Sequence, residues 1–290
     1  MEPIVRTIYG ARLQTALMRQ IPLVIESFTT LNEKLGILAG TVGAPGTYPK
    51  VGYVAIGNGG HSLTVGSDGI PRMKNLQHEA FDPVLFRQLP FVLRQLEDDI
   101  QPAERARYAL RKEIDIEGVT YIAYYLRRIP SDEASISCKL KRMVNGVRTS
   151  SPFIPTADNL TPSPVVASNS GVNVLTADYI TCESPMSVSF SAADVEELLK
   201  AVEIIHGDRD AAIISEMALC SGIDKTISVS STSGPFNFTD AIQVQVVTHI
   251  ACGHLMMNAS NGMEKILDVG SNSPLYRVGS NSPLYRIGAI

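Results

Sequence analysis

The chain has 290 residues, of which 44% are hydrophobic and 19% charged, so it can bury a substantial core beneath a lightly charged surface. Its net charge of -4 argues against general nucleic-acid binding, which requires a strongly basic face. Aromatic residues make up only 6% and Trp is absent, which argues against domains that stack nucleic-acid bases or bind carbohydrates through aromatic rings. A surface with few charges suits a subunit that hides part of itself against neighbours.

The first 25 residues do not read as a targeting signal, because Arg6, Arg12 and Arg19 are spread along them instead of preceding an apolar block. No apolar run approaches the roughly 18 residues that a membrane helix needs, so we expect no membrane partner. Four cysteines, at 138, 182, 220 and 252, are far apart in the sequence. This spacing favours reduced, buried thiols over a disulfide framework, although disulfides remain the alternative.

The N-terminal segment has the pattern of a helix. Apolar residues recur at helical spacing from Ile4 to Ile21, Pro22 should kink or restart the helix, and Gly36 should end it. Residues 51–56 then read as a short buried strand. The thirty residues after that strand read as loop.

A helix entry and two hairpins are predicted next. Asp82-Pro83 predicts the start of a helix over Val84–Gln88. The alternating pattern between Leu110 and Leu126, with a turn at Glu117-Gly118, predicts a β-hairpin. A second hairpin is predicted around Asn145-Gly146, which supplies the positive φ angles of a tight turn.

The C-terminal half begins with a Pro- and Ser-rich passage over 151–170 that predicts a linker. A helix is predicted from a cap at Ser191, with Asp194 three residues on, to Gly207. Residues 211–220 form a mixed apolar segment that fits either a strand or a helix. Residues 241–252 alternate and predict a strand.

These elements predict an α+β fold that is rich in antiparallel hairpins, with an N-terminal helix and one amphipathic helix in the C-terminal half. The predicted organisation has four parts: a helix-plus-hairpin domain over 1–150, the linker over 151–170, a C-terminal α+β domain over 171–268, and a tail arm over 269–290. The tail repeats one nonapeptide without change, at 269–277 and 278–286. Two copies are too few for a solenoid, so the tail is either a tolerated duplication or an extended arm that docks on a neighbouring subunit.

Residue patterns for catalysis or metal binding are weak. Gly57-Asn-Gly-Gly follows a strand, as a phosphate loop does, but it lacks the third glycine of the dinucleotide fingerprint and no Gly-Lys-Ser/Thr follows it. His61 and His78 flank this loop without a carboxylate at metal-ligand spacing. His249, Cys252 and His254 lie close in sequence, yet on a strand His249 points away from the other two. We therefore expect no catalytic residues, no cofactor and no metal site.

Three groups of charged residues are interpreted as ordinary surface charges and not as catalytic or DNA-binding sites. The carboxylates at 97–99 are expected to form a solvated acidic turn. Two basic clusters, Arg105/Arg107/Arg111/Lys112 and Lys139/Lys141/Arg142/Arg148, would contact phosphates if they lined a DNA channel. Acidic neighbours dilute the first cluster, so a solvated or subunit-pairing face is the preferred interpretation and nucleic acid is not an expected partner.

A series of short motifs lies between about residues 50 and 268 and includes Gly57-Asn-Gly-Gly-His61, Gly69-Ile-Pro71, Gln77-His78, Leu89-Pro-Phe-Val-Leu-Arg94, Arg107-Tyr-Ala-Leu-Arg-Lys112, Gly118-Val-Thr-Tyr-Ile-Ala-Tyr-Tyr125, Thr149-Ser-Ser-Pro-Phe-Ile-Pro155, Ser191-Ala-Ala-Asp194, Ile213-Ile-Ser-Glu216 and Cys220-Ser-Gly-Ile-Asp-Lys225. Together these strings resemble a family of virion structural proteins from tailed, contractile-tail bacteriophages. The resemblance implies a subunit of a virion that is assembled in the host cytoplasm. It carries no catalytic residues, and the tail repeat departs from it.

The function expected from these observations is therefore a non-enzymatic structural subunit of the tail or baseplate, with copies of itself and other virion proteins as partners. A neck or collar position, or association with the capsid, is the alternative location. A receptor- or sugar-binding module, or a hydrolase using the Gly57 loop and His61, is the alternative of another class. The expected contact residues are Pro90, Phe91, Val92, Leu93, Leu275, Tyr276, Leu284 and Tyr285.

Overall fold

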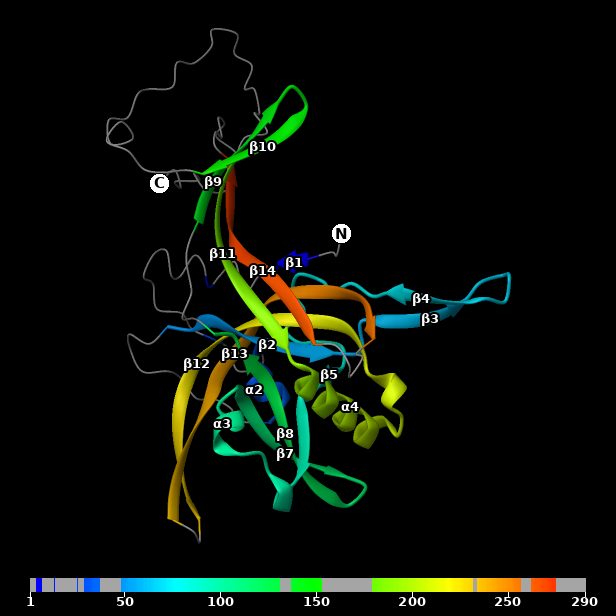
Figure 1. Ribbon diagram of the computed structural model, residues 1–290, viewed down its shortest axis with the longest axis vertical. Coiled ribbons are helices and arrows are strands. Elements are labelled where there is room, and N and C mark those ends of the chain that lie inside the picture. The colour runs from blue at the N-terminus through cyan, green and yellow to red at the C-terminus, as the bar shows by residue number, and fades with distance from the viewer. Residues whose placement is uncertain are drawn as a thin grey trace, which may run out of the picture. The chain divides into compact units, whose positions relative to one another are not determined.

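The computed structural model describes residues 4–6, 13, 25, 29–36, 48–130, 137–152, 179–231, 234–256 and 262–274. Within these residues the fold is β-rich and antiparallel, with few helices, which confirms the predicted fold class (Figure 1). The chain divides into two compact units, and each draws on two separate stretches of sequence. The first unit combines residues 1–130 with 188–265, and the second combines 131–187 with 266–290.

The first unit is built on an eight-stranded sheet in the order β1-β13-β12-β2-β8-β6, with β5 paired to β2 and β7 paired to β8. Its strands are β1 (Ile4–Arg6), β2 (Lys50–Gly57), β5 (Gln88–Leu89), β6 (Val92–Gln95), β7 (Tyr108–Ile116), β8 (Val119–Arg128), β12 (Ile213–Ser231) and β13 (Gly234–Met256). A separate two-stranded sheet, β3 (His61–Val65) with β4 (Pro71–Asn75), belongs to the same unit.

Helical elements of the first unit are mostly short. They are α2 (Leu31–Lys34), η2 (Leu96–Asp98), α3 (Pro102–Arg105), α4 (Ala192–His206) and η4 (Arg209–Ala211). The longest, α4, begins with the predicted capping box, in which Ser191 and Asp194 each accept a hydrogen bond from the other's backbone N–H. It ends at Gly207, which has φ 73°. None of the helices in the described ranges is long and apolar enough to span a membrane.

The second unit is a four-stranded sheet in the order β10-β9-β11-β14. Its strands are β9 (Ser137–Val144), β10 (Val147–Pro152), β11 (Tyr179–Phe190) and β14 (Met263–Pro274). The predicted Asn145-Gly146 turn joins β9 to β10, with φ angles of 50° and 77°. Residues 153–178, which hold most of the predicted linker, and residues 275–290 of the tail lie outside the described residues.

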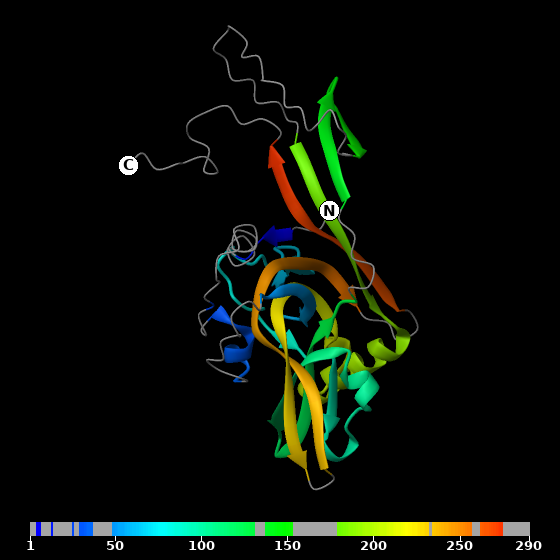
Figure 2. The same cartoon turned by 90° about the vertical axis from the view of Figure 1, so that its left-hand side faces the viewer.

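The predicted division of the chain at 151–170 differs from the division in the structure. Strand β12 pairs with β2, and β13 pairs with β1, so the C-terminal half completes a sheet that the N-terminal half begins (Figure 2). The hydrophobic core reflects this mixing, because Tyr53 and Ala55 of β2 and Ala123 of β8 share one cluster with Cys220 of β12 and Val246 of β13. Local composition at a linker carries no information about such long-range pairing.

Other predicted elements are confirmed or corrected by the strands. The 51–56 strand, the Glu117-Gly118 hairpin and the 241–252 strand are confirmed, and the ambiguous segment 211–220 lies largely in strand β12. The predicted loop after residue 56 contains the β3–β4 hairpin instead. Residues 4–6 form β1, not the start of a helix, and most of the remaining N-terminal prediction lies outside the described residues.

A bulge in β13 shows how the N-terminal segment is held. Gln243 has a positive φ of 54°, which interrupts the regular ladder. The side chain of Asn32 replaces the missing partners, since its Nδ2 donates to Ala241 O at 2.7 Å and its Oδ1 accepts from Val244 N at 2.9 Å. Asn32 is buried, so both atoms depend on these bonds.

Candidate functional site

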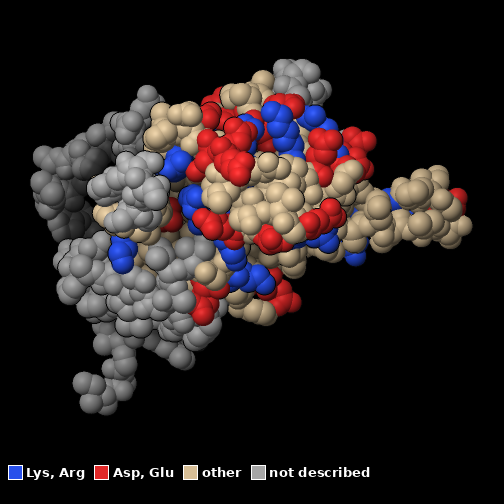
Figure 3. Space-filling model, turned by 90° about the horizontal axis from the view of Figure 1, so that it is seen from below, with Lys and Arg blue, Asp and Glu red and all other residues tan. Residues whose placement is uncertain are grey.

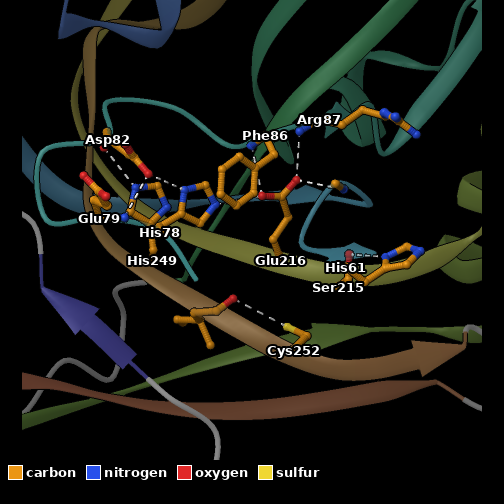
Figure 4. A network of polar contacts seen from close by, with 12 residues as sticks. His61, His78, Glu79, Asp82, Phe86, Arg87, Ser215, Glu216, His249 and Cys252 are labelled. Carbon is orange, nitrogen blue, oxygen red and sulfur yellow. Dashed lines mark hydrogen bonds and ion pairs between the residues drawn. The ribbon is translucent and has the colours of Figure 1, made fainter. Parts of the chain in front are cut away.

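A cluster of two histidines and two acidic residues, all buried except the partly exposed Asp82, lies where β12, β13 and the 76–87 loop meet (Figure 4). At its centre the side chain of Glu216, on β12, is 1% exposed. Oε2 of Glu216 accepts a hydrogen bond from Nε2 of His78 at 2.8 Å. On its other side, Nδ1 of His78 lies 3.1 Å from Oδ2 of Asp82.

Backbone N–H groups fill the remaining acceptor positions of Glu216. Oε1 accepts from Gly59 N at 3.0 Å and from Arg87 N at 2.9 Å, and Oε2 also accepts from Phe86 N at 3.0 Å. Burial alone would raise the pKa of Glu216, but the bonds from His78 and from these backbone groups outweigh it and hold that pKa below its usual range. The carboxylate therefore fastens two loops to one strand.

This bonding explains why the helix predicted over Val84–Gln88 is absent. In a helix that begins at Asp82-Pro83, the first N–H groups would need capping partners. The later N–H groups would donate to carbonyl oxygens within the helix itself. Here the N–H groups of Phe86 and Arg87 point to Glu216, and Asp82 Oδ2 accepts from Glu79 N at 2.9 Å. The charged side chain on a distant strand thus overrides the local helix signal.

Aromatic stacking encloses the imidazole of His78. The ring of Phe86 stacks on one side at 3.9 Å between centroids, and the ring of His249 stacks at 3.8 Å. His249 Nε2 lies 3.0 Å from Asp82 O and its Nδ1 is buried with no partner within the described part of the chain. Burial lowers the pKa of His249, and the adjacent His78 lowers it further, so this ring is neutral near pH 7.

The glycines before His61 are explained by the same cluster. A Cβ on Gly57 would lie 2.4 Å from both Arg87 O and Glu216 Oε1, and a Cβ on Gly59 would lie 2.7 Å from Arg87 N. One on Gly60 would lie 2.7 Å from Ser215 O. The loop that resembles a phosphate cradle therefore wraps a carboxylate of the protein itself, and its glycines allow that close approach.

His61 and His78 are the two predicted candidates of the hydrolase alternative, and they lie on either side of Glu216 in Figure 4. Nδ1 of His61 contacts Ser215 Oγ at 2.9 Å. This is a Ser–His pair, but Ser215 is 0% exposed, so its hydroxyl is sealed from a substrate in this structure. The carboxylate that a triad requires is bonded to His78 and to backbone groups instead.

The histidine and cysteine set at 249–254, which the sequence predicts not to converge, is described only in part. His249 stacks on His78, whereas Cys252 Sγ lies 3.9 Å from Ile250 O, and the side chain of His254 is outside the described ones. In the described ranges, no group of three or more His, Cys, Asp and Glu residues is arranged to hold a metal ion. Cys220 and Cys252 are buried free thiols.

Contact residues predicted at 90–93 occupy the core. Phe91, Val92 and Leu93 are buried because β6 pairs with β8, and the ring of Phe91 stacks on that of Phe190 at 5.6 Å. The structure therefore places these residues in the core of the first unit, and their predicted role as contact residues stays a prediction. The other predicted contact residues, Leu275, Tyr276, Leu284 and Tyr285, lie outside the described residues.

The predicted acidic turn and the first basic cluster are partly explained by ion pairs. Asp99 is not solvated as predicted, since it accepts from Tyr124 Oη at 2.7 Å and pairs with Arg105 at 2.8 Å. Arg107 pairs with Asp194 at 2.7 Å, and Lys112 Nζ donates to Leu35 O. On the face in Figure 3, Lys and Arg side chains lie among Asp and Glu side chains.

Residues 1–282 match the model of a family described as a family of unknown function, DUF7208. No curated protein and no solved structure matches.

Proposed function

Since the chain belongs to the DUF7208 family of unknown function, we propose its role from its own residues: a non-enzymatic structural subunit of a tailed bacteriophage particle that acts through subunit–subunit contacts. The tail or baseplate is the proposed location, and the neck or collar is the alternative. The phage assignment rests on the motifs in the sequence. The assembly role rests chiefly on one feature of the fold, the exposed apolar face of the β3–β4 hairpin.

The β3–β4 hairpin has one apolar face. Leu63 lies opposite Met73 and Val65 opposite Pro71, and side chains of directly opposite residues point to the same side. The other face carries Thr64 opposite Arg72 and Ser62 opposite Lys74. Leu63 is 71% exposed and Val65 is 70% exposed, and Ile70 at the tip is also exposed.

An exposed apolar ribbon of this kind is unusual for a protein that acts alone. Figure 1 shows the hairpin standing away from the eight-stranded sheet, and Figure 3 shows it as a largely uncharged protrusion. An isolated two-stranded hairpin is marginally stable in water, and contiguous exposed apolar groups mark interaction sites. We infer that a neighbouring subunit covers the face formed by Leu63, Val65, Pro71 and Met73.

Two further observations support a contact role over the alternatives. The carboxylate of Glu216 and both ring nitrogens of His78 are already bonded to the protein, so the histidine cluster offers no free catalytic group through them. Arg105, Arg107 and Arg111 each pair with a carboxylate, which reduces the charge available for DNA phosphates and favours the baseplate over a DNA-lining ring.

Light scattering on the purified full chain tests the assembly role. We expect a defined multimer that dissociates when Leu63 and Val65 are both replaced by Lys. The matched control replaces Ser62 and Thr64, on the opposite face of the same strand, by Lys and should leave the multimer intact. A wild-type chain that stays monomeric at high concentration, with both variants unchanged, would contradict the proposal.

Mass spectrometry of purified particles from a phage that encodes this chain tests the location. We expect its peptides in intact particles and in isolated tails. Their absence from particles that contain the other structural proteins would exclude a virion role.

A further inference from the structure

A cleft of about 380 Å³ lies in the first unit, between α3, β7, β8 and the outer part of β13. Its walls carry the aromatic rings of Tyr108, Tyr124 and Phe238 and the guanidinium groups of Arg105, Arg111 and Arg128. Asp240 also lines it. This volume is in the range of pockets that hold a small ligand or a single side chain.

The three arginines of the cleft already have carboxylate partners outside it. Arg105 pairs with Asp99 at 2.8 Å, Arg111 lies 3.4 Å from Glu113, and Arg128 pairs with Asp224. Arg128 also donates from Nη2 to Thr239 O at 2.7 Å. The positive charge of the walls is therefore largely balanced within the protein.

Asp240 differs from these arginines, because no partner among the described residues balances its charge directly. It is only 6% exposed, yet it has no hydrogen bond and no ion pair within contact distance in the described part of the chain. Burial raises its pKa to about 6, and Arg128 and Arg111 are near enough to offset this only in part. A carboxylate that lines a cleft without a donor from the described residues can accept one from a ligand, and groups with perturbed pKa values gather at binding sites.

We propose that this cleft binds the guanidinium group of an arginine side chain from a partner protein, with Asp240 as its carboxylate partner. A guanidinium matches a carboxylate in charge and planar geometry and can stack on an aromatic wall such as that of Phe238. An anion is disfavoured because each arginine already has a carboxylate partner, with Nε of Arg105 the only buried nitrogen among them left without a hydrogen bond to the described residues, whereas Asp240 has no ion-pair partner there. As a subunit contact this inference rests on the proposed assembly role, but the binding chemistry of the cleft does not.

The repeated nonapeptide of the chain itself is a candidate source of this arginine. Each copy of the repeated nonapeptide ends in Leu-Tyr-Arg, at Arg277 and Arg286. A second copy of this chain could therefore supply the arginine, together with an apolar and an aromatic residue. Another virion protein is the other source of the same chemistry.

The test is a titration of the full chain with N-acetyl-arginine methylamide, followed by NMR of the Asp240 carboxyl carbon and by calorimetry. We expect weak binding that falls at least tenfold in Asp240→Asn, with a lower titration midpoint for Asp240 when the probe is bound. Asp98→Asn, at an exposed carboxylate, is the matched control and should bind like wild type. The neutral isostere N-acetyl-citrulline methylamide should bind at least tenfold more weakly than the arginine probe.

Equal binding of the arginine and citrulline probes, or undiminished binding by a folded Asp240→Asn variant, would overturn the site. A synthetic nonapeptide with the repeated sequence distinguishes the sources. Tighter binding than the single-residue probe, lost in Asp240→Asn, supports a second copy as the donor, and binding no tighter than that probe supports another protein. Because the probes need no multimer, a monomeric chain that binds them would contradict the assembly role and leave the site intact.

Discussion

Glu216 Oε2 and His78 Nε2 lie 2.8 Å apart, although 138 residues separate them in the sequence. Both are buried, and the carboxylate also collects three backbone N–H groups from two loops. The pair thus joins strand β12 to the Gly57 loop and to the 76–87 loop. The pair acts as an internal cross-link of the first unit, and its removal should lower the free energy of unfolding.

Replacing Glu216 by Gln should lower the free energy of unfolding by about 3 kcal/mol, because the amide brings an N–H₂ toward backbone donors and leaves His78 without its anion. Urea denaturation followed by circular dichroism measures this. Glu113→Gln, at an exposed carboxylate paired with Arg111, is the control and should change stability by less than about 0.5 kcal/mol. Equal effects of the two variants would show that the buried cluster is not a cross-link.

The glycine loop provides a second test. Gly57→Ala should cost about 2–3 kcal/mol, since its Cβ would lie 2.4 Å from Arg87 O and would displace the Glu216 carboxylate. Gly52→Ala, on the same strand, has its nearest side-chain atoms at 3.9 Å and should be close to neutral. Thermal unfolding of both variants measures the difference. A Gly57→Ala protein as stable as the Gly52→Ala protein would contradict the tight fit.

Local signals in the sequence predicted much of the secondary structure. The turns at Glu117-Gly118 and Asn145-Gly146 and the cap at Ser191 are correct because each depends on a few adjacent residues with definite backbone preferences. The helix predicted at Val84–Gln88 is wrong because its N–H groups bond to Glu216. No local pattern indicates a partner about 130 residues away.

The sequence contains only one weak indication of the buried cluster around Glu216. Glu216 is a single charge within the apolar run 211–220, which signals a buried carboxylate that needs a partner. The partner could not be identified, since it depends on which strands pair. Burial of residues 90–93 was missed for the same reason, because it depends on the pairing of β6 with β8 from Val92 onward and on the bond from Phe91 N to Tyr124 O.

Asp194 gives a prediction at acid pH. Burial alone would raise its pKa, but the ion pair with Arg127 and hydrogen bonds from the Ser191 backbone and from Arg107 lower that pKa to about 2. Because the folded pKa lies below the unfolded value, this stabilisation is present above about pH 4 and is lost as the pH falls toward 2. Asp194→Asn should cost about 2 kcal/mol at pH 7 and much less near pH 2.

Urea denaturation of wild type and Asp194→Asn at several pH values between 7 and 2 measures this loss. The matched variant is Ser191→Ala, which removes the cap hydroxyl but no titrating group, and its cost of about 1 kcal/mol should vary less with pH. A cost of Asp194→Asn that is the same at every pH would show that the arginines do not stabilise the charged carboxylate.

His249 gives a prediction nearer neutral pH. Burial and the neighbouring His78 lower its pKa, so the unfolded chain takes up a proton before the folded one does. The contribution of the neutral ring to stability is present above the unfolded pKa of about 6.5 and is lost as the pH falls below that value.

His249→Phe keeps a ring for the stack on His78 but cannot titrate. The drop in unfolding free energy between pH 7.5 and pH 5 should therefore be smaller in His249→Phe than in wild type. If the two proteins lose the same stability over this range, His249 is not a source of acid sensitivity, and the loss must arise at other histidines or carboxylates.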